Sequence, residues 1–180
     1  MILALKANVI IFLSIFYPDV SKICLHPQYN DQTMDYDIAL LHLRSGVNYS
    51  DAMSPVCLPS PRGNFPAGTQ CFVSGWGQIS ESGPISDKLR VARVPIIDRE
   101  SCKKMYKQNK ITSRMICAGY EQGRIDSCQG DSGGPLVCME NGTFVLAGAV
   151  SWGFGCANQR QPGVYTNIVP LWSWIDKKLA

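Results

Sequence analysis

Short apolar runs separated by Gly, Pro, Asn and Ser dominate the chain after residue 20. Runs of this length between turn-forming residues predict an all-β protein with many turns. We expect strands at residues 38–43, 70–75, 91–97, 134–138, 144–152 and 163–168. Helical spacing occurs at residues 98–106, which Asp98 can cap, and at residues 169–179, where an apolar stripe repeats. A β-barrel or sandwich closed by a C-terminal helix fits this order.

The first 20 residues have a different pattern. Residues 2–17 are almost wholly apolar apart from Lys6, and the run from residue 7 to residue 17 has the length of a secretory signal core. It is short for a bilayer span, and no small-x-small cleavage site follows it. We interpret residues 1–20 as a signal-like or anchor-like segment, or as a stretch foreign to a domain that occupies residues 21–180.

The composition supports a folded domain in an oxidising compartment. The chain has 180 residues, of which 46% are apolar, so it can build a core. Eight cysteines without any C-x-x-C pair favour disulfides over a zinc site, and we predict neither a metal nor a cofactor. The net charge is only +3, and the lysines of residues 103–110 lack an aromatic platform. We therefore predict a solvated helix face there and no nucleic-acid partner.

Candidate chemistry is densest between residues 126 and 135. Glycines flank Ser132, so the backbone can turn sharply and a substrate carbonyl can approach free amide N–H groups. The pattern G-x-S-x-G also occurs in α/β-hydrolases, where an acid and then a histidine follow the serine, but no histidine follows Ser132. The order histidine, aspartate, serine needs an upstream acid, and Asp37 supplies one at the head of an apolar strand. The second order is therefore favoured.

Six motifs in this order resemble the trypsin family of serine proteases. They are DIALL at 37–41, VSGWG at 73–77, ICAG at 116–119, GDSGGP at 130–135, SWG at 151–153 and PGVYT at 162–166. The resemblance covers roughly residues 22–180. It implies a chymotrypsin-like double β-barrel with a C-terminal helix, with the second barrel complete and the first barrel incomplete.

The resemblance also implies roles for particular residues. Ser132 is similar to the nucleophile, Asp37 to the acid that orients the histidine, and the N–H groups of Gly130 and Ser132 to the oxyanion hole. Asp131 resembles the residue that pairs with the amine released by zymogen cleavage.

A substrate pocket is implied by a second group of residues. Asp126 matches the pocket base, so that a Lys or Arg side chain of the substrate is selected. Gly153 and Gly163 match its walls. The segment Ser151, Trp152 and Gly153 matches the edge that pairs with the substrate backbone.

The cysteines are assigned by the same resemblance. It implies the disulfides Cys71–Cys138, Cys102–Cys117 and Cys128–Cys156. Cys57 resembles a cysteine that ties the protease domain to an upstream propeptide or light chain. Cys24 has no family counterpart, and a bond between Cys24 and Cys57 stays open.

The expected catalytic histidine is missing. The family histidine precedes its aspartate by roughly 45 residues, whereas 36 residues precede Asp37. His26 and His42 lack the Ala-Ala-His-Cys context. We therefore expect an N-terminally incomplete serine endopeptidase domain specific for Lys or Arg, catalytically impaired in this form. The alternative is a non-catalytic homologue that acts as a binding module.

The resemblance extends to partners and location. Expected partners are protein or peptide substrates with Lys or Arg, and serine protease inhibitors. The expected location is secreted, or on the extracellular face of the plasma membrane.

Overall fold

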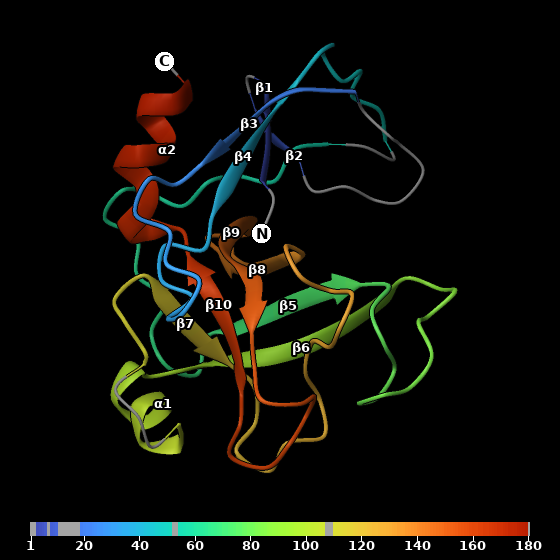
Figure 1. Cartoon of the computed structure of the whole chain (residues 1–180), viewed down its shortest axis with the longest axis vertical. Coiled ribbons are helices and arrows are strands. Elements are labelled where there is room, and N and C mark those ends of the chain that lie inside the picture. Colours follow the sequence, from blue (N-terminus) through green and yellow to red (C-terminus); the bar gives the residue numbers. More distant parts are fainter. Residues whose placement is uncertain (1–2, 7, 11–18, 52–53, 107–109, 180) are drawn as a thin grey trace.

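Six antiparallel strands close into a barrel in the lower half of Figure 1. The computed structural model describes residues 3–6, 8–10, 19–51, 54–106 and 110–179. The barrel strands are β5 (Gln70–Gly75), β6 (Arg90–Ile97), β7 (Met115–Ala118), β8 (Pro135–Glu140), β9 (Thr143–Trp152) and β10 (Gly163–Asn167). Their spatial order is β10-β7-β6-β5-β8-β9. This closed barrel confirms the complete second barrel that the motifs predicted.

A four-stranded sheet lies above the barrel in the same view. It contains β1 (Leu3–Lys6), β2 (Asn8–Ile10), β3 (Val20–Leu25) and β4 (Ala39–Leu43), in the order β2-β1-β4-β3. Strand β4 pairs antiparallel with β3 and parallel with β1. Among the described residues this sheet is open, so β3 is an edge strand.

The predicted strands recur within two residues of their expected ends, but four further strands were not predicted. These are β1, β2, β3 and β7. Strand β3 has the sequence VSKICL and is exposed at five of its six positions, so it lacks the apolar alternation that marks a half-buried strand. Strand β7 has only four residues, which is too short for a periodic signal.

Both predicted helices form. Helix α1 (Arg99–Met105) begins after Asp98, whose carboxylate accepts a hydrogen bond of 2.9 Å from the backbone N–H of Ser101. The second begins as a 3-10 turn, η1 (Val169–Leu171), and continues as α2 (Trp172–Leu179). Among the described residues, no helix is long and apolar enough to cross a membrane.

A cluster of buried apolar side chains packs the open sheet against the barrel. Ile38 directly precedes β4, and Leu40 lies within it. Both are buried in a cluster with Leu146 of β9 and with Leu171 and Ile175 near the C-terminus. Each fully buried Leu or Ile of this kind stabilises the fold by about 1.5–3 kcal/mol. The cluster fixes the start of β4 against the barrel, and this is where Asp37 lies.

Three disulfides form, and they are the three pairs that the resemblance implied. They join Cys71 to Cys138, Cys102 to Cys117, and Cys128 to Cys156. The bond between Cys24 and Cys57 that the sequence left open does not form. Both of these thiols are free: Cys24 is half-buried and Cys57 is exposed.

Candidate active site

Asp37 is held against the barrel by side chains from two of its strands. Ser151 of β9 donates a hydrogen bond of 2.6 Å from Oγ to Oδ2 of Asp37. Thr166 of β10 donates one of 2.7 Å to the backbone carbonyl of Asp37. Strands distant in sequence thus place this carboxylate beside the segment predicted to pair with substrate.

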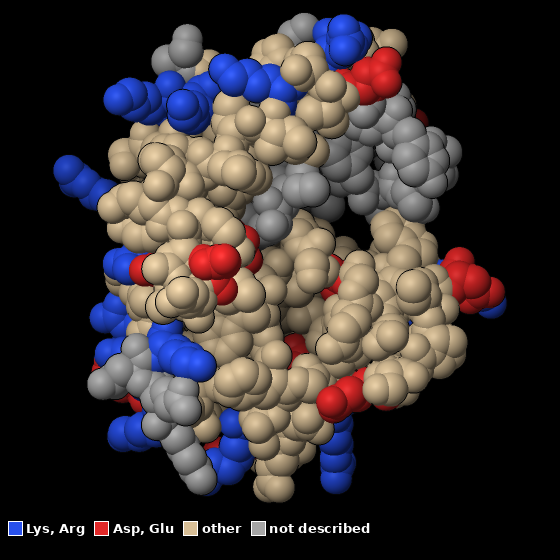
Figure 2. Space-filling view, in the orientation of Figure 1, with Lys and Arg blue, Asp and Glu red and all other residues tan. Residues whose placement is uncertain are grey.

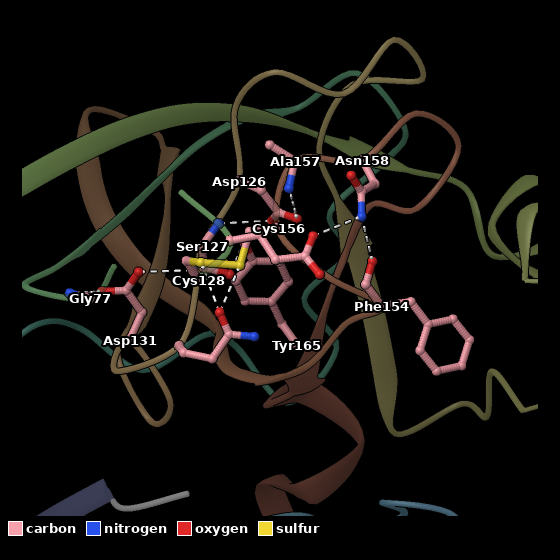
Figure 3. The surroundings of a disulfide bond; sticks show 12 residues. Gly77, Asp126, Ser127, Cys128, Asp131, Phe154, Cys156, Ala157, Asn158 and Tyr165 are labelled. Carbon is pink, nitrogen blue, oxygen red and sulfur yellow. Dashed lines mark hydrogen bonds between the residues drawn. A yellow bond between two sulfur atoms is a disulfide. The ribbon is translucent and has the colours of Figure 1, made fainter. Parts of the chain in front are cut away.

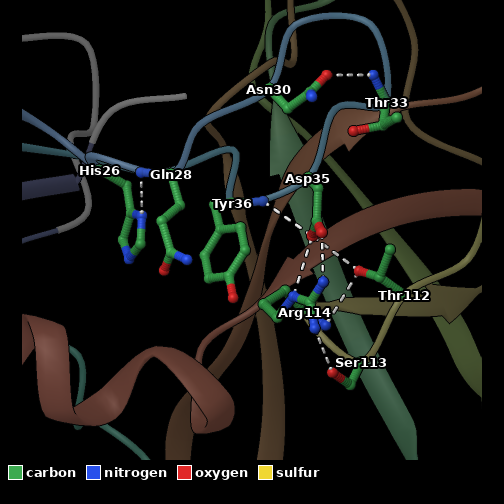
Figure 4. Close-up of polar contacts among 9 residues, drawn as sticks. All are labelled: His26, Gln28, Asn30, Thr33, Asp35, Tyr36, Thr112, Ser113 and Arg114. Carbon is green, nitrogen blue, oxygen red and sulfur yellow. Dashed lines mark hydrogen bonds and ion pairs between the residues drawn. The ribbon is translucent and has the colours of Figure 1, made fainter.

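A second carboxylate, two residues earlier, anchors the same segment. Asp35 accepts hydrogen bonds from Thr112 Oγ1 at 2.8 Å, from Arg114 Nε at 3.1 Å and from Arg114 Nη2 (Figure 4). The Arg114 guanidinium also lies over the ring of Tyr36, 4.6 Å from its centroid. We call this group of Asp35, Thr112 and Arg114 the Asp35 clamp.

The clamp changes the acidity of its carboxyl group. Burial alone would raise the pKa of Asp35, but hydrogen bonds from Arg114 and Thr112 outweigh it and hold the pKa below its usual value. The clamp cannot be recognised in the sequence, because Asp35 and Arg114 are 79 residues apart. The only local signal was an acidic residue, Asp35, two positions before the DIALL motif.

The loop that carries Ser132 is organised around Asp131. The Asp131 carboxylate accepts hydrogen bonds from the N–H of Gly77 at 2.7 Å and of Cys128 at 2.9 Å (Figure 3). Ser132 itself is exposed. Within the described residues, neither its hydroxyl nor the N–H groups of Gly130 and Ser132 form a hydrogen bond. Those donors are available to an incoming group.

Gly130 is required at its position for two reasons. Its φ is +94°, in the left-handed region that favours glycine. A Cβ there would also lie 3.1 Å from the Cα of Gly77. A side chain would therefore push the loop away from Gly77, just after β5, and turn the free N–H groups.

Ser132 and Asp126 line one cavity of about 180 Å³. We call it the primary cavity. It is lined by Asp126, Ser127, Cys128, Gln129, Ser132, Val150, Ser151, Trp152, Gly153, Gly155 and Gly163. All five residues predicted to bind substrate are among them. The structure thus brings together the predicted nucleophile and the predicted pocket base.

The two predicted wall glycines differ in how tightly they are enclosed. A Cβ on Gly163 would lie 2.6 Å from Oδ1 of Asp126 and 3.0 Å from the ring of Tyr165. At Gly153 the nearest atom, the carbonyl oxygen of Gly155, would be 3.8 Å away. A side chain at Gly163 would therefore press on the carboxylate, whereas one at Gly153 would project into space.

Asp126 is a half-buried carboxylate without a cation. Burial raises its pKa to about 6, although the N–H groups of Ser127, at 2.8 Å, and Ala157, at 3.4 Å, partly offset the effect. Within the described part of the chain, no Lys or Arg forms an ion pair with it. In Figure 2 most positive side chains lie along the left margin and the top, with others at the lower and right edges, and acidic atoms are visible near the centre of the face. The site therefore favours a positively charged ligand.

Neither histidine lies at this cavity. His26 is buried, stacks on Tyr36 at 4.6 Å and accepts a hydrogen bond of 3.1 Å from the Gln28 N–H (Figure 4). Burial lowers its pKa. His42 is exposed on β4 and contacts the hydroxyl of Ser21 at 2.8 Å. The described residues therefore offer no imidazole to take a proton from Ser132.

Two comparisons with known proteins bear on this geometry. The Trypsin family profile matches residues 16–175. The chain is also 44% identical over 159 residues to coagulation factor XI of Bos taurus, an alignment that covers 88% of this chain. The chain belongs to the trypsin family of serine proteases. It spans 25% of the length of that factor XI relative.

Family membership agrees with the disulfide framework and the barrel described above. The three disulfides fit a protein that folds in an oxidising compartment. Within the described residues, no group of three or more His, Cys, Asp or Glu side chains could hold a metal ion.

Proposed function

We propose that this chain is a trypsin-like serine endopeptidase domain whose primary cavity takes the Lys or Arg side chain of a protein substrate. One observation carries the proposal: a half-buried carboxylate without an ion-pair partner, Asp126, shares a cavity with the exposed residue Ser132. Burial removes part of the hydration of the Asp126 carboxylate. A substrate cation that reaches it replaces this hydration with an ion pair, whereas a neutral side chain leaves the carboxylate unpaired.

The remaining groups fit acyl transfer at Ser132. Attack by its Oγ on a substrate carbonyl would develop negative charge near the unengaged N–H groups of Gly130 and Ser132. Residues 151–153 at the end of β9 would pair with the substrate backbone and hold the scissile bond in place. Asp37, bonded to Ser151, would orient and stabilise a protonated histidine.

The histidine is the part that the described residues do not supply. Removal of a triad histidine lowers kcat by about 10⁶-fold. We therefore propose that the chain in this form is catalytically impaired. In this proposal residues 21–180 are a partial protease domain, and residues 1–20 stand where the histidine-bearing segment belongs.

A second candidate is a non-catalytic homologue that binds basic side chains. It is favoured by the same cavity, because cation binding needs Asp126 but neither Ser132 nor a base.

Under either function we propose a secreted or extracellular-face location. Protein substrates and serine protease inhibitors would be partners, and the exposed Cys57 would be the link to an upstream chain.

Binding of p-aminobenzamidine, a fluorescent aryl amidine, tests the pocket. We expect the chain to bind it, Asp126→Asn to abolish binding, and Ser132→Ala to leave binding unchanged. Absence of binding by the folded wild-type chain would contradict the proposed cation pocket.

Labelling by a fluorophosphonate tests the chemistry at Ser132. We expect labelling orders of magnitude slower than that of a complete trypsin-family protease, and none in Ser132→Ala. Rapid labelling would refute the proposed impairment, whereas no labelling even at long times, with amidine binding intact, would favour the binding module.

A further inference from the structure

The wall of the primary cavity is tied to a distant loop by one side chain. We call residues 153–158 the pocket wall; Gly153 and Gly155 of this segment line the cavity. Asn158 Nδ2 donates a hydrogen bond of 3.2 Å to the carbonyl of Phe154 (Figure 3). It donates a second one, also of 3.2 Å, to Oε2 of Glu81. Glu81 belongs to the loop between β5 and β6, 77 residues away in sequence.

These two groups pack directly on the wall backbone. Gly155 has a φ of +75°, and a Cβ there would collide with Nδ2 of Asn158 and with Oε2 of Glu81. The space beside the Gly155 Cα is thus filled by the Glu81 and Asn158 contact itself. Loss of the Glu81 carboxylate would leave this side of the wall without support.

The wall in turn reaches the carboxylate at the pocket base. Ala157, the residue before Asn158, donates its N–H to Oδ2 of Asp126 at 3.4 Å, and its carbonyl accepts from the N–H of Arg124 at 2.8 Å. A hydrogen bond of 3.4 Å is close to the limit at which it contributes, so a small displacement of the wall removes it. The position of Asn158 therefore affects how Asp126 is solvated.

We propose that Glu81 is a positioning residue for the primary cavity: by holding Asn158, it fixes the pocket wall in the form that accepts a basic side chain. Glu81 does not line that cavity, and it acts through Asn158. The loop between β5 and β6 thereby regulates cation binding, and a partner that draws Glu81 away weakens it. This inference rests on the proposed function, because it takes the cavity to be a cation site.

Hydrogen exchange tests the positioning role without any ligand. We expect Glu81→Ala to accelerate amide exchange in residues 153–158 and to leave residues 135–152 unchanged, relative to wild type. Glu100→Ala, which removes the same charge from α1, is the matched control and should leave the wall unchanged. Unaltered exchange in the wall of Glu81→Ala would overturn the inference.

The affinity for p-aminobenzamidine distinguishes the positioning role of Glu81 from a direct effect of its negative charge on the bound cation. We expect Glu81→Ala to weaken binding roughly fivefold, the upper range for one exposed hydrogen bond to a charged acceptor. Glu81→Gln keeps an acceptor oxygen for Asn158 and should lose less than twofold. If Glu81 acted only by attracting the cation, Glu81→Gln would lose as much as Glu81→Ala, and the positioning role would be refuted.

A double-mutant cycle completes the test. Asn158→Ala should weaken amidine binding at least as much as Glu81→Ala, and adding Glu81→Ala to it should cause no further loss. Additive losses would overturn the inference. If the wild-type chain binds no amidine while the exchange result holds, the proposed function fails and the positioning of the wall by Glu81 stands.

Discussion

The carboxylate of Asp126, which would give the proposed preference for Lys or Arg, also lowers the stability of the folded chain when it is ionised. Its pKa is raised to about 6 from an ordinary value of 3.8, chiefly because burial opposes ionisation. A raised carboxyl pKa means that the folded state holds its proton more tightly than the unfolded state. The free energy of unfolding therefore falls as pH rises from about 4 to about 6. At pH 7.5 this group lowers it by about 3 kcal/mol relative to acid pH, where the carboxyl is protonated in both states.

Asp126→Asn should consequently raise the thermal stability at pH 7.5. We expect Tm to rise by several degrees because the variant removes a half-buried, unpaired charge and leaves an oxygen for the Ser127 N–H. Calorimetry at pH 4.5, where the wild-type carboxyl is mostly protonated, should show a much smaller difference. A variant that melts below wild type at pH 7.5 would contradict this reasoning.

Cation binding should depend on pH through the same group. Because an amidinium binds the ionised carboxylate, affinity for p-aminobenzamidine should be constant above pH 7 and fall as pH drops through about 6. Well below that value the loss approaches tenfold per pH unit. A titration of the dissociation constant between pH 4.5 and 8 measures it, and a flat profile would exclude Asp126 as the binding group.

At the scale of elements, the Asp35 clamp joins the segment before β4 to the segment before β7. Asp35→Asn should lower stability by about 2 kcal/mol, because Arg114 loses a charged hydrogen-bond acceptor in a half-buried site. For a chain of this size that is roughly a 5 °C fall in Tm. Asp31→Asn, at an exposed turn nearby, is the control and should change Tm little.

The clamp also has a predicted pH dependence. Since the pKa of Asp35 is depressed, its contribution is present above about pH 4 and is lost as pH falls below that value. The difference in Tm between wild type and Asp35→Asn should therefore shrink in acid. A constant difference down to pH 2.5 would show that the carboxylate charge is not what stabilises the contact.

The sequence predicted those elements whose own residues determine them, and it did not predict those that depend on pairing with distant residues. Strands β5 and β9 carry continuous apolar runs, and Ser132 and Asp126 lie in one short motif, so both were predictable. Strand β3 is defined by pairing with β4, and its own residues are mostly exposed. Contacts such as Arg114 with Asp35 join residues far apart in sequence, and only the fold brings them together.

At the scale of the whole molecule, the open sheet presents an apolar edge. Ile23 and Leu25 of β3 are 60% and 67% exposed, and β3 is paired on one side only among the described residues. Unpaired backbone groups beside apolar side chains favour association with another chain. We therefore expect the purified chain to self-associate as its concentration rises.

Ile23→Lys should reduce this association, since a charge at a strand edge opposes pairing. Ile85→Lys is the matched control, because Ile85 is 70% exposed in a loop of the other half. Sedimentation velocity over a range of concentrations compares the variants. Equal association in wild type and Ile23→Lys would show that β3 is not the contact.

The closed barrel draws all of its strands from a continuous stretch of chain, between residue 70 and residue 167. Every internal strand finds its neighbours inside that stretch, and the three disulfides also lie within it. The pairing and the covalent cross-links of the barrel are therefore encoded within that one stretch, whereas the apolar and polar contacts of its upper rim are completed by upstream residues such as Ile38 and Asp37.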